Sequence, residues 1–463
     1  METYDVAVIG GGVAGLQAAF RAVARDRTVA LVEKEVLGGT CLTRGCIPTK
    51  AMVRSAEVAH LARRAEEFGI DIEGEIEADM NRVVDRKDRI VEDVVDVNRH
   101  EVAETDAVDL YEGTATFEDP HTLRVDGDAI GADQIILATG ARPFVPDWPG
   151  VDEVDPLTSR ELLDLDEVPD ELIVVGGGYI GLECAQILGR LGSDVTVVQR
   201  SVILKQEDQQ LIDLLRERLE AEGIELREGT GVERLEAKGD RVLVHGADED
   251  NEPVTITGDE LLVAVGREPV DGDLNLDQAG VETWGPGWIE TDDQLGTTQE
   301  NIWAVGDCIG EQMFTHVARY EVEVAIRNAL EDGEEAVDYF AAPYAVFTDP
   351  QLGRVGMTLE EAEDAGYDAM EAEWTFEHLG KALCLGETDG MMKAVADRET
   401  GQLLGFHCLA HEGAELVHEA IVVMNDRGTV EELSDAIHIH PTMAEGVNDT
   451  AYTAAIRLGR REW

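Results

Sequence analysis

The stretch YDVAVIGGGVAGLQAAFRA, residues 4–22, decides the fold of this chain. An apolar run typical of a buried strand leads into a glycine turn, and a helical pattern follows. Gly10, Gly12 and Gly15 stand at G-x-G-x-x-G spacing, which permits a tight turn and close approach of the backbone to a pyrophosphate. The next apolar strand ends at Glu33, whose carboxylate can accept hydrogen bonds from the ribose hydroxyls of an adenosine. This order of elements predicts a dinucleotide-binding βαβ unit.

The same pattern recurs in ELIVVGGGYIGLECAQILGRLGSDVTVVQR, residues 171–200. Here the acid is missing, because Gln199 stands in its place and Arg200 follows. An acid would repel a 2′-phosphate whereas an arginine attracts one, so we expect this site to prefer NADPH. The alternative is that Arg200 is only a solvated loop residue. The glycines of this second site are Gly176, Gly178 and Gly181.

Two dinucleotide sites in one chain indicate that electrons pass between two cofactors. Three further apolar strands run into glycine turns, and such strand ends face a cofactor crevice in doubly wound sheets. These turns contain Gly140, Gly266 and Asp307. We expect Asp307 to bind a ribityl or ribose hydroxyl, although an isolated aspartate there is more often a turn former.

The stretch GGTCLTRGCIPTK holds two cysteines, Cys41 and Cys46. Zinc is not expected, because no second Cys/His pair stands at ligand spacing. Positions five apart on a regular helix diverge, so a disulfide here requires a distorted turn, which Gly45 and Pro48 make feasible. A helical pattern follows, and a helix N-terminus with Lys50 beside it would stabilise a thiolate. We interpret the pair as a redox-active dithiol at the start of a helix.

Near the other end, AIHIHPTMAEGV places His440 five residues before Glu445. A histidine can move protons near neutral pH, and a carboxylate on one ring nitrogen fixes the tautomer of the other. Taken alone, His440 would more often be a packed or capping histidine. Beside a dithiol and two nucleotide sites, it is the candidate acid–base partner.

Composition restricts the environment and the partners. The chain has 463 residues, enough for about three domains, and a net charge of −61. Such acid excess opposes folding unless molar salt screens it, which indicates a halophilic protein and excludes nucleic acid and anionic membranes as partners. No membrane helix or secretory signal is visible, so we expect a cytoplasmic protein. Four cysteines are expected to be buried small residues: Cys184, Cys308, Cys384 and Cys408.

The stretch NRVVDRKDRIVEDVVDVNRHEVAE is predicted to be a long helix. Its local basicity is unusual for this chain, and we expect a solvated face with intrahelical ion pairs rather than a contact with an anionic substrate. The basic residues are Arg82, Arg86, Lys87, Arg89 and Arg99.

On these motifs, in this order, the chain closely resembles the class I pyridine nucleotide–disulfide oxidoreductases. This family includes glutathione reductase, dihydrolipoamide dehydrogenase and mercuric reductase. The resemblance implies an α/β fold with two Rossmann-like nucleotide-binding domains, for FAD and NAD(P), and a C-terminal α+β dimerisation domain. The expected segments are 1–149 and 271–340 for the FAD domain, 150–270 for the NAD(P)H domain and 341–463 for dimerisation.

The resemblance also assigns roles to residues. Lys50 and Glu183 correspond to an ion pair beside flavin and nicotinamide, and Tyr179 to the aromatic residue that covers the nicotinamide pocket. Residues 315–318 correspond to the segment near the pyrimidine edge of the flavin. The expected ligands of FAD and NADPH together are Gly10, Gly12, Gly15, Glu33, Thr40, Lys50, Gly140, Gly176, Gly178, Tyr179, Gly181, Arg200, Gly266, Asp307 and His316.

The implied reaction passes electrons from NADPH through FAD to a Cys41–Cys46 disulfide. Cys46 corresponds to the flavin-side thiol and Cys41 to the thiol that attacks a substrate disulfide. His440, held by Glu445, would come from the partner subunit and protonate the leaving thiol. An obligate homodimer follows, because each active site needs both chains.

Departures from the family pattern reduce the number of candidate substrates. Lipoamide dehydrogenases usually carry an acid at the place of Gln199, and mercuric reductases a C-terminal cysteine pair in place of a histidine such as His440. Glutathione reductases typically carry serine and arginine where this chain has Val13 and Phe20, and that arginine meets the glycine carboxylate of glutathione.

Halophilic archaea as a group use γ-glutamylcysteine, which lacks that glycine. Our leading hypothesis is therefore an NADPH-dependent reductase of bis-γ-glutamylcystine. The alternatives are a dihydrolipoamide dehydrogenase and, in a different class, a non-catalytic FAD-binding redox sensor.

Overall fold

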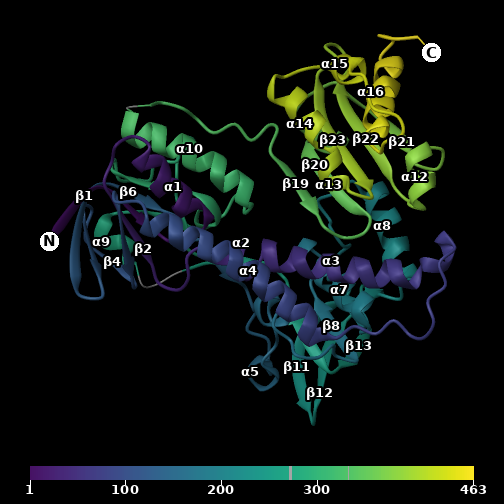
Figure 1. Ribbon diagram of the computed structural model, residues 1–463, viewed down its shortest axis with the longest axis horizontal. Coiled ribbons are helices and arrows are strands. Elements are labelled where there is room, and N and C mark those ends of the chain that lie inside the picture. Colours follow the sequence, from purple (N-terminus) through teal and green to yellow (C-terminus); the bar gives the residue numbers. More distant parts are fainter. Residues whose placement is uncertain (271–273, 332, 463) are drawn as a thin grey trace. The chain divides into compact units, whose positions relative to one another are not determined.

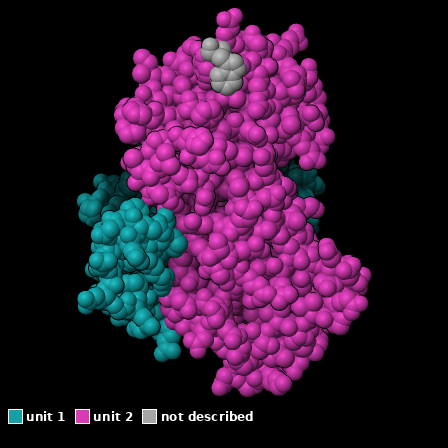
Figure 2. All heavy atoms as spheres, turned by 90° about the vertical axis from the view of Figure 1, so that its right-hand side faces the viewer, with its two compact units in different colours: residues 1–146, 157–167, 263–337 teal, residues 147–156, 168–262, 338–463 magenta. Residues whose placement is uncertain are grey.

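The computed structural model describes residues 1–270, 274–331 and 333–462, which form two compact units (Figure 2). Unit 1 comprises residues 1–146, 157–167 and 263–337, and unit 2 comprises residues 147–156, 168–262 and 338–463. The predicted segment start at 271 and the predicted end at 463 lie outside the described residues. The four predicted segments stay a proposal.

Unit 1 is built on a seven-stranded sheet of order β3-β2-β1-β6-β5-β4, with β18 paired to β6. The strands β3, β2, β1, β6 and β18 run parallel, whereas β5 and β4 continue the sheet antiparallel. The strands are β1 (Glu2–Ile9), β2 (Val29–Glu33), β3 (Val108–Glu112), β4 (Ala115–Asp119), β5 (Thr122–Val125), β6 (Asp128–Leu137) and β18 (Ile302–Ala304).

Helices α1 and α10 of unit 1 pack against each other (Figure 1). The core lies between them and the sheet, and Val6, Ala7 and Val8 of β1 have no exposed surface, as expected of a parallel strand covered on both faces. The helices are α1 (Val13–Val23), α2 (Gly39–Thr43), α3 (Cys46–Arg63), η1 (Ala65–Phe68), α4 (Met80–Ala103), α6 (Ser159–Leu162), α9 (Leu276–Ala279), η2 (Gly306–Ile309) and α10 (Thr315–Glu331). The short strands are β7 (Ala141–Pro143), β15 (Arg267–Pro269), β16 (Thr283–Trp284) and β17 (Trp288–Ile289).

Unit 2 contains the second glycine turn on a four-stranded sheet of order β10-β9-β8-β14, and β8, β9 and β10 are parallel. A three-stranded antiparallel sheet of order β11-β12-β13 accompanies it. The elements are α5 (Val151–Val154), β8 (Glu171–Val175), α7 (Tyr179–Leu191), β9 (Asp194–Val198), α8 (Gln209–Ala221), β10 (Glu225–Arg227), β11 (Gly231–Lys238), β12 (Arg241–Ala247), β13 (Pro253–Gly258) and β14 (Glu260–Val263).

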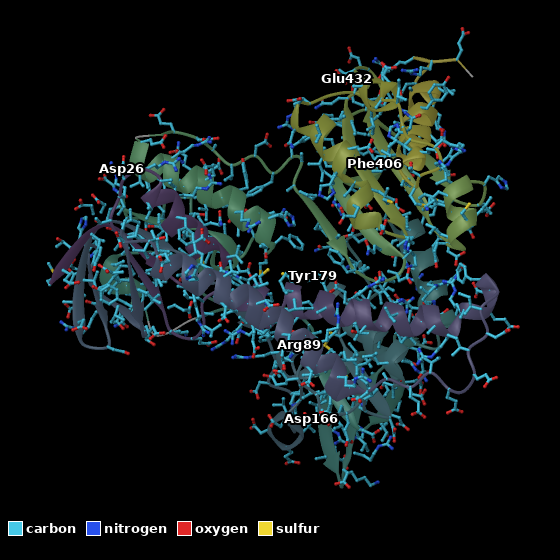
Figure 3. The ribbon with its side chains drawn as sticks, viewed as in Figure 1. Asp26, Arg89, Asp166, Tyr179, Phe406 and Glu432 are labelled. Atoms are coloured by element: carbon cyan, nitrogen blue, oxygen red, sulfur yellow. The ribbon has the colours of Figure 1, made fainter. Side chains whose placement is uncertain are left out.

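The C-terminal part of unit 2 is a five-stranded antiparallel sheet of order β19-β20-β23-β22-β21. Helix α16 packs on β21 and β22, and Phe406 of the central strand β23 is fully buried (Figure 3). The elements are β19 (Pro343–Val346), β20 (Gln351–Gly356), α11 (Leu359–Asp364), β21 (Ala369–Thr375), α12 (Gly380–Leu385), β22 (Met391–Asp397), β23 (Leu403–Ala410), α13 (Gly413–Leu416), α14 (His418–Asn425), α15 (Val430–Asp435) and α16 (Glu445–Arg457).

One expectation about burial is wrong. Cys384 is exposed, on α12, whereas Cys184, Cys308 and Cys408 are buried as expected. The helix predicted after the dithiol is α3, and its apolar residues Val58 and Leu61 are 53% and 51% exposed in the single chain. Within the described ranges, no helix is long and apolar enough to cross a membrane.

Candidate functional site

The first glycine turn requires glycine at two positions for steric reasons. Gly10 has φ +104°, and a Cβ there would lie 2.3 Å from the carbonyl oxygen of Ala138. A Cβ on Gly15 would lie 1.7 Å from the Gly10 carbonyl oxygen. At Gly12 the nearest atom to a Cβ is Gly39 Cα at 3.8 Å. Gly10 and Gly15 therefore close the turn, while the backbone at Gly12 remains open to a ligand.

Glu33 ends β2 and is held beside this turn. Its Oε2 accepts a hydrogen bond from the Gly11 N–H at 2.7 Å, and its Oε1 accepts one from the Glu35 N–H at 2.7 Å. The two bonds orient a carboxylate at the carboxyl end of a parallel strand, where dinucleotides bind in such sheets.

Asp307 and Arg267 form a second polar group in unit 1. Arg267 Nη2 lies 3.4 Å from Asp307 Oδ2. Burial raises the pKa of Asp307, and the charge of Arg267 opposes that rise. The buried Nε of Arg267 has no hydrogen-bond partner among the described residues. A buried donor without a partner is costly, so these residues and the open glycine turn fit a polar ligand such as FAD.

Other residues predicted to bind cofactor lie at turns or helix starts of unit 1. Gly140 follows β6 with φ +72°, and Gly266 precedes β15 with φ +144°. Thr40 belongs to α2. His316 lies in the first turn of α10, exposed and stacked on Phe314 with ring centroids 5.7 Å apart.

The second glycine turn repeats the first. Gly176 has φ +121°, a Cβ on Gly181 would lie 1.9 Å from the Gly176 carbonyl oxygen, and a Cβ on Gly178 would meet nothing within 4 Å. Gln199 Oε1 accepts a hydrogen bond from the Gly177 N–H at 3.0 Å. Gln199 thus repeats the hydrogen bond of Glu33 without its negative charge.

The surroundings of Gln199 are polar and cationic. Its Nε2 donates to Ser201 Oγ at 2.8 Å. Arg200 and Lys205 are exposed, and neither forms a hydrogen bond or ion pair with any described residue. Tyr179 is the first residue of α7 and is half-buried.

The two thiols meet at a break between helices. Cys41 lies in α2, and α3 begins at Cys46, so only the second cysteine is at a helix start. A Cβ on Gly45 would lie 2.9 Å from the Thr40 carbonyl oxygen, which explains the glycine at the break. The two thiols lie close enough for each to shift the pKa of the other, and Thr315 Oγ1 lies 3.6 Å from Cys46 Sγ.

The two cysteines differ in electrostatics. The hydrogen bond from Cys41 lowers the pKa of Cys46 to about 6, aided by the Thr315 hydroxyl and the charge of Lys50 and opposed by burial. The same hydrogen bond and burial raise the pKa of Cys41, against the Thr315 hydroxyl and the charge of Arg319. At neutral pH the thiolate therefore resides on Cys46 and the proton on Cys41.

Lys50 lies one helical turn after Cys46 on α3. Glu183 is buried on α7, and its Oε1 accepts a hydrogen bond from the Phe347 N–H at 2.9 Å. Lys50 belongs to unit 1 and Glu183 to unit 2, so the ion pair between them stays a prediction.

His440 and Glu445 form the expected pair in unit 2. His440 Nδ1 lies 2.9 Å from Glu445 Oε1, while Glu445 Oε2 accepts a hydrogen bond from the Thr442 N–H at 2.9 Å. These two bonds lower the pKa of Glu445, the backbone bond contributing more. The carboxylate thus orients the ring. The imidazole is 77% exposed, and Nε2 forms no hydrogen bond within the described part of the chain.

Sequence reasoning missed the effect of two residues on the thiols and did not single out Lys381. Thr315 and Arg319 of α10 act on the thiols from a helix far along the chain. Lys381 is adjacent to Gly380, where a Cβ would lie 4.0 Å from Cε1 of His440. Lys381 has no ion-pair partner among the described residues. Lysine is rare in this chain, which has only seven, and that rarity could have drawn attention to Lys381 in the sequence.

Comparison with known proteins identifies the family. The pyridine nucleotide-disulphide oxidoreductase family matches residues 4–321, and its dimerisation domain matches residues 342–451. The dihydrolipoyl dehydrogenase of Halobacterium salinarum is 39% identical over 96% of this chain and 95% of its own length. The mercuric reductase of Bacillus cereus is 35% identical over 96% of this chain and 70% of its own. Among solved structures, the HOCl-induced flavoprotein disulfide reductase RclA of Escherichia coli matches with a TM-score of 0.88 and 32% identity, covering 97% of this chain and 99% of that one.

The chain belongs to the class I pyridine nucleotide–disulfide oxidoreductase family and is a flavin-dependent disulfide oxidoreductase. The predicted fold class is confirmed, and the sensor without catalysis is excluded. Members of this family bind FAD and a pyridine nucleotide, and the dimerisation domain supports a homodimer. Relatives from Halobacterium and Haloferax fit the halophilic interpretation of the charge.

We predict that Cys46 of the reduced holoenzyme titrates near pH 6. Its pKa is lowered, so the thiolate is present above about pH 6 and is lost as the pH falls through that value. Alkylation of Cys46 by iodoacetamide, followed by peptide mass spectrometry, should show a rate midpoint at about pH 6.

Cys41→Ala removes the largest cause of the lowered pKa, and the midpoint should rise by about one pH unit or more. Cys384→Ser removes an exposed thiol of unit 2 and should leave the midpoint unchanged. A wild-type midpoint near that of an ordinary cysteine would contradict the assignment of the thiolate to Cys46.

Proposed function

We propose that this enzyme uses NADPH to reduce bis-γ-glutamylcystine. The observation that supports the coenzyme is the matched pair of hydrogen bonds at the two glycine turns. Gly11 N–H donates to the charged Glu33, whereas Gly177 N–H donates to the neutral Gln199. The second turn keeps the geometry of a dinucleotide site and removes the charge that would repel a 2′-phosphate. It also adds Arg200, which pairs with no carboxylate of the described residues.

The support for the substrate comes from α1. Phe20 packs against the unit 1 core at the position where glutathione reductases carry an arginine. No cation stands at this position for the glycine carboxylate of glutathione, and γ-glutamylcysteine has no such carboxylate.

When bound, FAD supplies the two-electron path between the pyridine nucleotide and the disulfide. The residues of the chain carry out the thiol exchange. A base removes the Cys41 proton, and the Cys41 thiolate attacks one sulfur of the substrate disulfide. The S–S bond breaks, a mixed disulfide forms, and the first thiolate leaves with a proton.

The second exchange releases the other half of the substrate. The Cys46 thiolate attacks Cys41 Sγ, the mixed disulfide breaks, and the second thiolate leaves and takes up a proton from solvent. The substrate gains two electrons and two protons while the dithiol becomes the Cys41–Cys46 disulfide. Since Cys41 holds its proton at neutral pH, the exchange needs the base that we assign to His440 of the partner subunit.

Lys381 gives the substrate side of this proposal a cation. Its backbone is adjacent to the residue that faces the His440 ring, and no described carboxylate neutralises it. Each half of bis-γ-glutamylcystine carries carboxylates, which a partner-free ammonium attracts. We propose that Lys381 positions the disulfide next to His440.

Dihydrolipoyl dehydrogenase activity is the second candidate, because haloarchaeal relatives carry that name. Steady-state kinetics in molar KCl decides between the two. We predict that NADPH with bis-γ-glutamylcystine gives the highest kcat/KM, above glutathione disulfide with NADPH and above lipoamide with NADH. Faster turnover of lipoamide with NADH would make the enzyme a dihydrolipoyl dehydrogenase and would overturn the argument from Gln199.

A single change at the second glycine turn tests the coenzyme choice. We predict that Gln199→Glu lowers kcat/KM for NADPH by about 10- to 100-fold, because the new carboxylate repels the 2′-phosphate while keeping the hydrogen bond to Gly177. The value for NADH should stay level or rise. Arg234→Gln is the control, since Arg234 already pairs with Glu236 on β11. Equal losses with both coenzymes would indicate damage to the turn instead of discrimination.

A variant at His440 tests the proton transfer. We predict that His440→Gln slows oxidation of the dithiol by substrate by about 10²- to 10⁴-fold, the usual contribution of a general acid–base. Reduction of the enzyme by NADPH, followed separately by stopped flow, should keep its rate. His418→Gln, an exposed histidine on α14, should change neither step. Slowing of both steps by His440→Gln would place the histidine outside the exchange.

A further inference from the structure

The unpaired arginines of this protein are unevenly distributed. Most described arginines form an ion pair with a carboxylate, as an acid excess of this size favours. Arg200 and Arg319, which stand at the proposed 2′-phosphate site and beside the thiols, are exceptions. Three further exceptions lie together on α4, which was expected to hold intrahelical ion pairs. They are Arg82, Arg86 and Arg89, and none pairs with any described carboxylate.

These three arginines line a cavity of about 770 Å³ in unit 1, together with Ser55 of α3 and five acids, Glu77, Asp79, Asp85, Asp88 and Glu92. Arg86 Nη1 donates to the Ala51 carbonyl oxygen at 2.7 Å, which ties α4 to α3. Arg89 Nε donates to the Asp85 carbonyl oxygen at 3.2 Å. An arginine has five N–H donors, so most donors of this cluster face the cavity or solvent without a protein partner.

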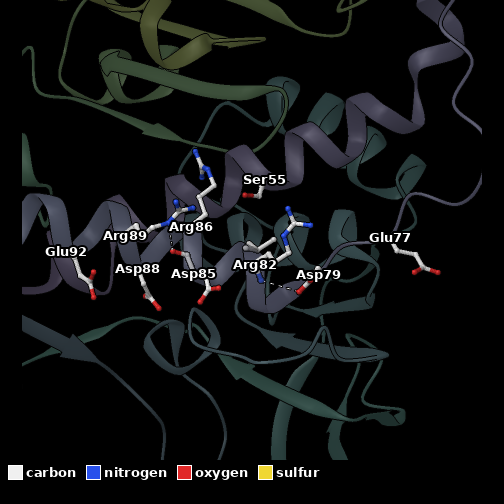
Figure 4. A pocket seen from close by; sticks show the side chains of 10 residues that line it. Ser55, Glu77, Asp79, Arg82, Asp85, Arg86, Asp88, Arg89 and Glu92 are labelled. Carbon is white, nitrogen blue, oxygen red and sulfur yellow. Dashed lines mark hydrogen bonds between the residues drawn. The ribbon is translucent and has the colours of Figure 1, made fainter.

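Charge is separated across the cavity. The guanidinium groups of Arg82, Arg86 and Arg89 point toward Ser55, whereas the carboxylates of Asp85 and Asp88 point to the opposite side of α4 (Figure 4). Asp79 is engaged as the helix N-cap and accepts a hydrogen bond from the Arg82 N–H at 3.2 Å. The positions i, i+4 and i+7 thus form a cationic stripe that the neighbouring acids do not neutralise.

We propose that this cavity binds a small oxyanion of the phosphate class, either free phosphate or the phosphoryl group of a phosphomonoester. Planar guanidinium groups match the oxygens of a tetrahedral dianion with paired hydrogen bonds. Molar salt screens long-range attraction, but direct charge-assisted hydrogen bonds are screened less. The net charge around the cavity is negative and does not attract anions. The oxyanion is therefore bound in preference to chloride through its direct hydrogen bonds with the arginines.

The test is the thermal unfolding midpoint of the full-length holoenzyme in KCl of constant molarity. Inorganic phosphate or glycerol phosphate at 10 mM should raise the midpoint by about 2 °C or more. The shift should vanish in Arg82→Gln/Arg89→Gln and persist in Arg99→Gln, whose side chain pairs with Asp96 on the same helix. Isothermal titration calorimetry of the same three proteins should find one site per chain in the wild type and Arg99→Gln only.

Each result of these measurements supports or overturns the oxyanion site. A response to both probes identifies a site for the oxyanion itself, and a response to glycerol phosphate alone identifies a phosphomonoester site. No response to either, or equal responses in all three proteins, overturns the proposal, because a general salt effect would not depend on Arg82 and Arg89.

Discussion

Both nucleotide sites depend on one hydrogen bond. In each glycine turn, a backbone N–H donates to the side chain at the end of the next strand. This bond joins Gly11 to Glu33 and Gly177 to Gln199. The bond ties the turn to the end of the neighbouring strand, at the helix N-terminus where phosphates bind in such folds. An amide oxygen accepts the same bond at 3.0 Å that a carboxylate oxygen accepts at 2.7 Å, so the geometry is kept while the charge changes. One fold can thus offer two sites of equal shape and different electrostatic preference.

The two thiols also share one local structure and differ in charge. Cys46 stands at the N-terminus of α3, with Thr315 at the start of α10 beside its sulfur, so both helices direct their positive ends toward one thiolate. Placing the proton on Cys41 divides the two thiols into a stabilised thiolate and a thiol that must be activated. An acid–base group outside the pair is then a chemical requirement. The exposed ring of His440, oriented by Glu445, has the geometry for it.

Local features of the site could be predicted from the sequence, and long-range ones could not. The glycine turns, Glu33, Gln199 and the pair of His440 with Glu445 are each encoded within a short stretch whose geometry follows from steric limits or a single hydrogen bond. The contact of Thr315 with Cys46 joins residues 269 positions apart, and no local sequence pattern predicts it. Exposure of Cys384 was missed for a related reason, because the residue type alone does not show whether another part of the chain covers it.

The charge of the protein makes its unpaired cations informative. With 98 acidic and 37 basic side chains, an exposed cation finds a carboxylate nearby unless the fold keeps carboxylates away. Arg200 and Lys381 remain without ion pairs among the described residues, and each stands where the proposed reaction brings an anion. Ion pairs with exposed acids contribute little stability, so leaving these cations unpaired costs the fold little and preserves their attraction for ligands. In an acidic halophilic surface, a cation held apart from carboxylates marks a place where the chain has been arranged to meet an anion from solution.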